Sequence, residues 1–180
     1  MPPQSTPTRA PTKQEQMAYG LLEKHKVIAP AVPVERIAKQ EGARIQFGPL
    51  DNELSGMVFF KDGVPIIGVN SLHHPNRQRF TIAHELGHLM LHRTKIEAGV
   101  HVDKELAVLR RDALAGKGID PIEMEANQFA ALLLVPDVLL EQTVPSSRHL
   151  DDEQIEALAK RFKVSTVTMQ FRLQRWLEKS

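Results

Sequence analysis

A helix that carries two histidines and a glutamate in an apolar setting is the feature that most constrains this sequence. The pattern of residues 75–93 predicts a helix that is apolar on several sides and is therefore buried. His84 and His88 stand four residues apart, which places their side chains on one helix face, about 5–6 Å apart at Cβ. Burying two histidines and Glu85 without partners is costly, so we expect these three side chains to act on a common ligand.

The spacing His84-Glu85-x-x-His88 is typical of a helix that binds a metal ion. Two imidazoles at this separation can converge on one ion, whereas Glu85 is rotated by about 100° and can accept a proton from a metal-bound water. Gly87 lies between the histidines and costs the helix about 1 kcal/mol relative to alanine, so we expect another segment to approach closely there. The alternative interpretation is an exposed helix face on which the histidines coincide by chance.

A catalytic zinc ion usually takes three protein ligands and leaves one position for water. His92 continues the four-residue spacing, but it lies about 12 Å from His84 along the helix axis. It therefore cannot bind the same ion as both other histidines, and we expect it to be a core or surface histidine. The third ligand is then expected to be a carboxylate from a separate helix.

Two glutamates on a second buried helix, predicted over residues 121–135, are candidates for that third ligand. Glu123 and Asn127 share a helix face, so Glu123 could bind the metal while Asn127 hydrogen-bonds a ligand histidine. Glu125 points about 200° away from Glu123 and is the alternative metal ligand, because only one of the two can face the ion. Both could instead be first-turn acids that stabilise the helix dipole.

The composition excludes several other kinds of site. The chain of 180 residues has no cysteine, which excludes disulfides, thiolate metal ligands and a thiol nucleophile. Its 23 basic and 22 acidic side chains leave a net charge of +1, so no global charge favours nucleic acid. No apolar run approaches the ~20 residues that a membrane span needs, and the proline-rich N-terminus has no apolar signal segment. We therefore expect a cytoplasmic protein.

The rest of the pattern predicts a small sheet and further helices. Lys61-Asp62-Gly63 indicates a hairpin turn between two strands, and Pro65 in the second strand predicts an exposed sheet edge. Residues 1–12 are expected to be a disordered proline-rich tail, and residues 97–120 a mobile connection. The expected strands cover residues 44–47, 57–60 and 64–69, and the expected helices cover 13–26, 33–42, 75–93, 104–114, 121–135, 151–162 and 166–178.

The last two predicted helices, with Ser165 as the N-cap of the second, resemble half of a helix-turn-helix. As a DNA-binding surface they would use Thr166, Thr168, Gln170 and Arg172. Basic and acidic side chains nearly balance over residues 151–180, so direct DNA binding is not expected. We expect this helical pair to pack on the rest of the protein, and it could also dock a substrate. The packing side chains would be Leu158, Phe162, Val167, Phe171, Leu173 and Trp176.

The two motifs together resemble the ImmA/IrrE family of metallopeptidases. The helix with His84-Glu85-x-x-His88 is followed by Glu123-x-x-x-Asn127-x-Phe129-Ala130-Ala131-x-Leu133-x-x-Pro136, and the resemblance extends from about Val34 to the final helix. It implies that His84, His88 and Glu123 are the metal ligands and that Glu85 is the general base. It also implies a zincin-like α+β fold, in which a small antiparallel or mixed sheet packs on a buried active-site helix and the helix-turn-helix-like pair lies at the C-terminus.

The resemblance further implies one zincin-like domain over residues 13–180, with the helical pair of residues 150–180 packed on it. Its activity would be that of a zinc-dependent endopeptidase, although Mn²⁺ or Fe²⁺ suit the same ligands. The implied substrate is a helix-turn-helix transcriptional repressor of the Xre type, whose cleavage would derepress phage, mobile-element or stress genes. Two alternatives remain: a non-catalytic binding partner or antitoxin-like regulator of a helix-turn-helix protein, and a DNA-binding regulator that uses the C-terminal helices.

Two parts of the expected reaction are not defined by the sequence. His73, His74, His101 and Tyr19 are available to stabilise an oxyanion, but no spacing distinguishes any of them. An extended substrate could pair with a free strand edge, and the strand that contains Pro65 is the expected position.

Overall fold

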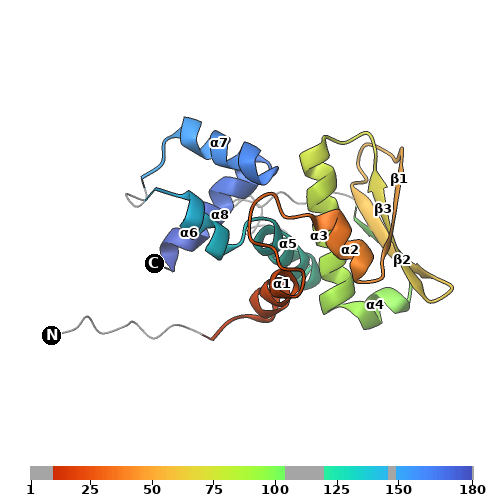
Figure 1. Ribbon diagram of the computed structural model, residues 1–180. Helices are drawn as coiled ribbons and strands as arrows, with labels where there is room; N and C mark the ends of the chain where they lie inside the picture. The colour runs from red at the N-terminus through yellow and green to blue at the C-terminus, as the bar shows by residue number, and fades with distance from the viewer. Residues whose placement is uncertain (1–9, 104–119, 146–148, 180) are drawn as a thin grey trace.

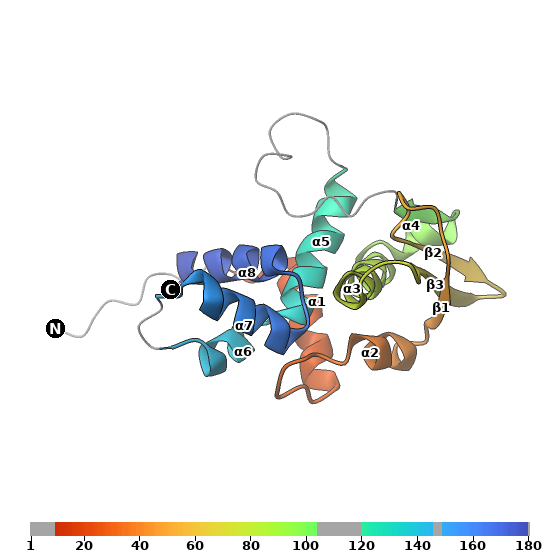
Figure 2. The same cartoon turned by 90° about the horizontal axis from the view of Figure 1, so that it is seen from above.

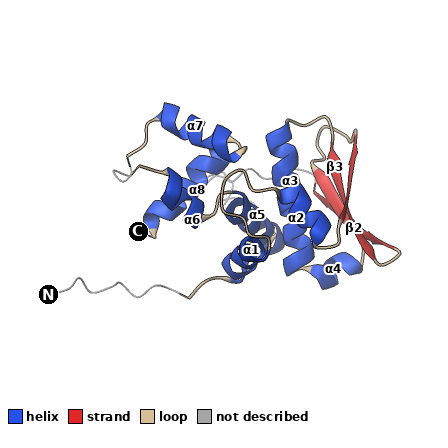
Figure 3. Cartoon of the chain, in the orientation of Figure 1, coloured by secondary structure: helices blue, strands red, loops and turns tan. Residues whose placement is uncertain are grey.

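The structure is a computed structural model that describes residues 10–103, 120–145 and 149–179. Its strands gather at one end of the molecule and helices form the rest (Figure 3). The sheet packs against the long helix α3 (Pro75–Leu91), and α5 (Pro121–Leu134) and α1 (Lys13–Lys24) follow on the far side of α3 (Figures 1 and 2). The C-terminal helices lie at the end opposite the sheet. No helix in these ranges is both long enough and apolar enough to cross a membrane.

The sheet has four strands in the order β1-β3-β2-β4, and it is mixed. The strand β1 (Arg44–Gly48) runs parallel to β3 (Val64–Asn70), whereas β2 (Gly56–Lys61) is antiparallel to both β3 and β4 (His101–Asp103). The predicted hairpin is confirmed. Asp62 and Gly63 both have positive φ, at 53° and 75°, which is the backbone that a two-residue hairpin turn with the right twist requires.

Three features of this end of the molecule differ from the expectation. The edge predicted at Pro65 is wrong, because β3 lies inside the sheet between β1 and β2. The proline is tolerated because the pairing of β3 with β1 starts only at Ile66. The backbone N–H that Pro65 lacks is therefore not needed for a hydrogen bond to β1. The short strand β4 and the helix α4 (Arg93–Glu97) were not predicted. The helix expected over residues 104–114 lies outside the described residues.

The other predicted helices are confirmed within two residues at each end. They are α1, α2 (Val34–Gln40), α3, α5, α7 (Asp152–Phe162) and α8 (Thr166–Glu178), and a further helix α6 (Asp137–Thr143) was not expected. Local signals explain where they start. Thr12 forms a capping box at α1, Asp151 forms one at α7, and Ser165 accepts a hydrogen bond from the Thr168 amide at α8.

The core lies between the sheet, α3 and α5, and α3 and α5 approach each other closely at Gly87. A Cβ atom at that position would stand 2.9 Å from Phe129 Cδ1 and 3.3 Å from the Cα of Ala126. The expected close approach at this glycine is therefore confirmed, and it brings the two motif-bearing helices into contact. The fully buried side chains of this core include Val58, Ile67, Ala83, Leu86, Phe129 and Leu133.

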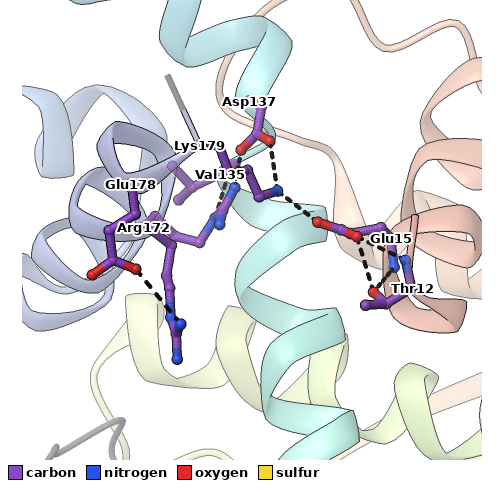
Figure 4. Close-up of polar contacts among 8 residues, drawn as sticks. Thr12, Glu15, Val135, Asp137, Arg172, Glu178 and Lys179 are labelled. Carbon is purple, nitrogen blue, oxygen red and sulfur yellow. Dashed lines mark hydrogen bonds and ion pairs between the residues drawn. The ribbon is translucent and has the colours of Figure 1, made fainter. Parts of the chain in front are cut away.

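A chain of ion pairs ties the C-terminal helix α8 to α6 and α1 (Figure 4). Arg172 is 2% exposed, donates from Nε to the Val135 carbonyl at 2.9 Å, and forms an ion pair with Asp137. Lys179 contacts both Asp137 and Glu15. Because a buried guanidinium without its partners is costly, these contacts fix the position of α8 on the rest of the molecule.

Candidate metal centre

His84, His88 and Glu123 converge at the contact between α3 and α5. The Nε2 atoms of the two histidines are 2.9 Å apart. Glu123 Oε2 lies 3.2 Å from His84 Nε2, and its Oε1 lies 3.3 Å from His88 Nε2. Both histidines are fully buried and the Glu123 side chain is 25% exposed. The alternative of an exposed helix face with coincidental histidines is therefore wrong, and of the two glutamates it is Glu123 that faces the histidines.

These separations suit a tetrahedral metal ion. Metal–ligand bonds of about 2.0–2.1 Å at tetrahedral angles place ligand atoms roughly 3.3 Å from one another. The two Nε2 atoms are 2.9 Å apart, and they lie 3.2 and 3.3 Å from the two different carboxylate oxygens of Glu123. One ligand atom from each of His84, His88 and Glu123 lies within 4.8 Å of the others, so the three residues could hold a single ion. Two imidazoles and one carboxylate form a donor set that zinc accepts.

The back of each histidine ring is held by a hydrogen bond. His84 Nδ1 lies 2.9 Å from Asn127 Oδ1. Because an amide oxygen only accepts, His84 Nδ1 donates the hydrogen in this bond. Asn127 thus lies where the shared face with Glu123 predicts it. His88 Nδ1 lies 3.3 Å from His92 Nδ1.

Glu125 does not face the cluster of His84, His88 and Glu123. Its Oε2 lies 3.0 Å from His92 Nε2. His92 in turn contacts Nδ1 of His88, whereas Glu123 contacts Nε2 of the same ring. The structure thus separates the two glutamates as the helix geometry requires. It also places His92 as a buried neighbour of His88, 8% exposed, outside the group that could hold the ion.

Burial and charge favour the protonation states that metal binding needs. Burial lowers the pKa of His88 to about 4, which favours the neutral imidazole. Burial alone would raise the pKa of Glu123, but the imidazoles of His101, His84 and His88 lower it well below its usual range. Glu123 is therefore ionised. Neutral histidine and ionised carboxylate are the ligand forms that bind a metal.

His101 is the site residue that the sequence did not distinguish. It lies on β4, where Val58 of β2 pairs with it, and its Nε2 is 2.9 Å from Glu123 Oε1. Its ring centroid is 4.1 Å from that of His88. The alternation Val100-His101-Val102-Asp103 is a weak strand signal that could have indicated it. The other candidates lie elsewhere, with His74 as the N-cap of α3 and His73 beside Asn70.

Glu85 is fully buried and lies between α3 and the sheet. A Cβ atom at Gly56 of β2 would stand 3.2 Å from Glu85 Oε1 and only 2.3 Å from Thr81 Cγ2. Because Gly56 has no side chain, the space beside β2 can be occupied by the Glu85 carboxyl group. The sheet and α3 together enclose this carboxyl one residue from the His84 ring.

Comparisons with known proteins show which family this chain resembles. A family model described as the IrrE N-terminal-like domain, Peptidase M78, matches residues 38–174. The radiation response metalloprotease IrrE of Deinococcus radiodurans is 37% identical over 105 residues, which cover 56% of this chain and 28% of that protein. This chain thus aligns with less than a third of that relative's length.

One solved structure is similar in fold. A transcriptional regulator of Mycobacterium tuberculosis superposes with a TM-score of 0.59 at 17% identity, over 88% of this chain and 45% of that chain. At this identity the likeness concerns the fold alone.

Proposed function

The chain belongs to the ImmA/IrrE family of Peptidase M78 domains, and from that premise we propose that it is a zinc-dependent endopeptidase that cleaves a helix-turn-helix transcriptional repressor. The observation that carries this proposal is the convergence of His84, His88 and Glu123 beside the buried Glu85. Within the proposal, the first three bind the metal ion and Glu85 is the general base. Asn127 orients His84 through the hydrogen bond to its Nδ1.

The reaction would divide between the ion and the side chains around it. A zinc ion held there would polarise the peptide carbonyl and lower the pKa of a coordinated water toward ~7. Glu85 would accept a proton from the attacking water and deliver it to the leaving amine. His101 lies at the rim of the cluster, with its side chain 26% exposed. In this proposal its imidazole would donate a hydrogen bond to the developing oxyanion.

The substrate is proposed to enter along the sheet edge nearest the cluster. The strand predicted for this role, which contains Pro65, is flanked on both sides and cannot accept another strand. Among the described strands, β4 pairs only with β2 and carries His101. An extended segment of the repressor could pair with the other side of β4, which would place its backbone next to Glu123.

A cleavage assay tests this proposal. The purified chain, loaded with zinc, is incubated with the Xre-type repressor encoded nearest to it, and the products are measured by intact-mass spectrometry. We expect Glu85→Gln to keep zinc and to lose cleavage. Glu97→Gln is the matched control, because Glu97 is exposed on α4, where it pairs with Arg93. Cleavage by Glu85→Gln at the wild-type rate would refute the assigned role of this residue.

The same assay separates the binding-partner alternative. If wild type and Glu85→Gln both release the repressor from its operator without cutting it, the protein acts by binding and not by hydrolysis.

The DNA-binding alternative is disfavoured by the C-terminal helices themselves. Thr168 and Arg172, two of its four proposed contacts, are only 6% and 2% exposed, and Arg172 is engaged with Asp137 and the Val135 carbonyl.

A further inference from the structure

One face of α3 lies against the start of strand β2, and this face carries Glu85. Arg77, Thr81 and Glu85 are spaced four residues apart on α3, so their side chains share that face. All three lie beside Ser55 and Gly56, two residues that we call the β2 entry. We infer that the β2 entry is a positioning segment that fixes the place of the Glu85 carboxyl group. The inference deepens the proposed function, because it rests on Glu85 being the general base.

Two contacts join the β2 entry to α3. Arg77 Nη2 donates a hydrogen bond to Ser55 Oγ at 2.9 Å. Further along α3, the position that a Cβ atom on Gly56 would take is 2.3 Å from Thr81 Cγ2 and 3.2 Å from Glu85 Oε1. The Thr81 methyl group and the Glu85 carboxyl group therefore both lie against the backbone of Gly56.

The sheet holds the β2 entry in place on both sides. Gly56 pairs with Val69 of β3 and with Asp103 of β4. Thr81 and Glu85 are fully buried, so neither side chain points into solvent. Because the strand is fixed by its neighbours, a side chain added at Gly56 would displace the Thr81 methyl group and the Glu85 carboxyl group.

The proposed metal ligands are held by a different contact of α3. Glu123 reaches the two histidines because α5 packs closely on α3 at Gly87, whereas the β2 entry lies beside Glu85. The helix α3 thus joins two parts of the site that are positioned separately, the ligands by α5 and the general base by β2. A change at the β2 entry is therefore expected to slow the reaction without lowering the affinity for zinc.

Alanine substitutions at two strand glycines test this inference. Gly56→Ala places a methyl group against Thr81 and Glu85, and 2.9 Å from the Gly68 carbonyl oxygen. Gly68→Ala is the matched control, because its methyl group would meet Cγ of the flexible Met57 side chain, also at 2.9 Å. In the repressor cleavage assay we expect kcat to fall about 100-fold in Gly56→Ala with KM little changed, since a misplacement of about 1 Å can have that effect. Gly68→Ala should keep the wild-type kcat, and zinc affinity, measured by competition with a chelator, should match wild type in both variants.

A smaller change at Thr81 tests the same contact without adding an atom. Thr81→Ser removes only the methyl group nearest to Gly56, which leaves room into which the Glu85 carboxyl group can shift, so kcat should fall and zinc affinity should stay unchanged. Ile82→Val removes one methyl group from a residue of α3 that is 2% exposed, and it is the control for lost packing alone. In the double variant Gly56→Ala with Thr81→Ser the nearest clash is gone, so part of the kcat lost in Gly56→Ala should return.

Crystal structures of the full-length variants give a readout that does not depend on activity. In Gly56→Ala the Glu85 carboxyl group should be displaced from its wild-type place, whereas His84, His88 and Glu123 should superpose on wild type. A Glu85 carboxyl group that has not moved would overturn the inference.

The outcomes distinguish this inference from the proposed function. A wild-type kcat in Gly56→Ala, equal losses of kcat in Thr81→Ser and Ile82→Val, or a zinc affinity that falls in parallel with kcat would each overturn the inference while the peptidase proposal stands. If Gly56→Ala does not fold, Thr81→Ser decides, and an unchanged kcat there overturns the inference. A wild-type chain that binds zinc but cleaves no repressor would overturn the proposed function, and the crystal structures would still decide whether the β2 entry fixes the place of Glu85.

Discussion

Replacing Gly87 with alanine should destabilise the protein, whereas the same change at Gly20 should stabilise it. Both glycines lie inside helices, Gly87 in α3 and Gly20 in α1. A Cβ atom at Gly20 would meet nothing within 4 Å, but at Gly87 it would stand 2.9 Å from Phe129 Cδ1 and 3.3 Å from the backbone of Ala126. The two substitutions thus share their chemistry and differ only in the space available.

The expected magnitudes follow from that difference. Alanine in place of glycine stabilises an exposed helix interior by about 0.5–1 kcal/mol, and this is the whole effect expected at Gly20. At Gly87 the same gain is opposed by overpacking, which costs about 1–3 kcal/mol in a well-packed core. The free energy of unfolding should therefore differ between the variants by about 1–3 kcal/mol. For a chain of 180 residues that corresponds to a Tm difference of roughly 2–12 °C.

Urea unfolding and thermal unfolding of the two variants measure this difference. Gly87→Ala should also weaken zinc binding, because α5 must move away from α3 and carries Glu123 with it. If Gly87→Ala is as stabilising as Gly20→Ala, then α3 and α5 are not in close contact at this position. The geometry that brings Glu123 to the two histidines would then be refuted.

Three further predictions concern single side chains. Asn127→Leu should lower zinc affinity about 10–100-fold in a chelator competition, because His84 loses the acceptor at its Nδ1; an unchanged affinity would contradict this role. Arg172→Ala should lower the free energy of unfolding by about 3 kcal/mol, because Asp137 loses its buried partner, and a loss below 1 kcal/mol would show that the ion pair does not hold α8. Burial alone would raise the pKa of Glu15, but Lys179 and Thr12 lower it from 4.5 to about 2, so its stabilising effect is complete above about pH 4.5 and is lost as the pH falls toward 2. In urea unfolding across this range, the free energy of unfolding should depend less steeply on pH in Glu15→Gln than in wild type. An identical pH dependence in the two proteins would show that the contact with Lys179 contributes nothing to stability.

Much of the site could be predicted because its main contacts are local in sequence. Helical spacing alone brings His84 and His88 to one face and separates Glu123 from Glu125 by more than half a turn. The same spacing pairs Glu123 with Asn127, and the structure places both toward the histidines. Patterns within one helix report such relations directly.

The parts that sequence reasoning missed depend on contacts between distant elements. His101 reaches Glu123 only because β4 pairs with β2, and a strand of three residues leaves almost no periodic signal. The position of Pro65 inside the sheet depends on which residue of β3 first pairs with β1. The contact between Glu125 on α5 and His92 at the end of α3 likewise requires the two helices to pack together, which the pattern of one helix does not specify.

The most direct test of this account is an anomalous diffraction map of zinc-loaded crystals, collected on both sides of the zinc absorption edge. The account predicts one peak within bonding distance of His84 Nε2, His88 Nε2 and a Glu123 carboxylate oxygen, with no ligand from His92 or Glu125. A peak coordinated by His92 or Glu125, or no peak between α3 and α5, would contradict it.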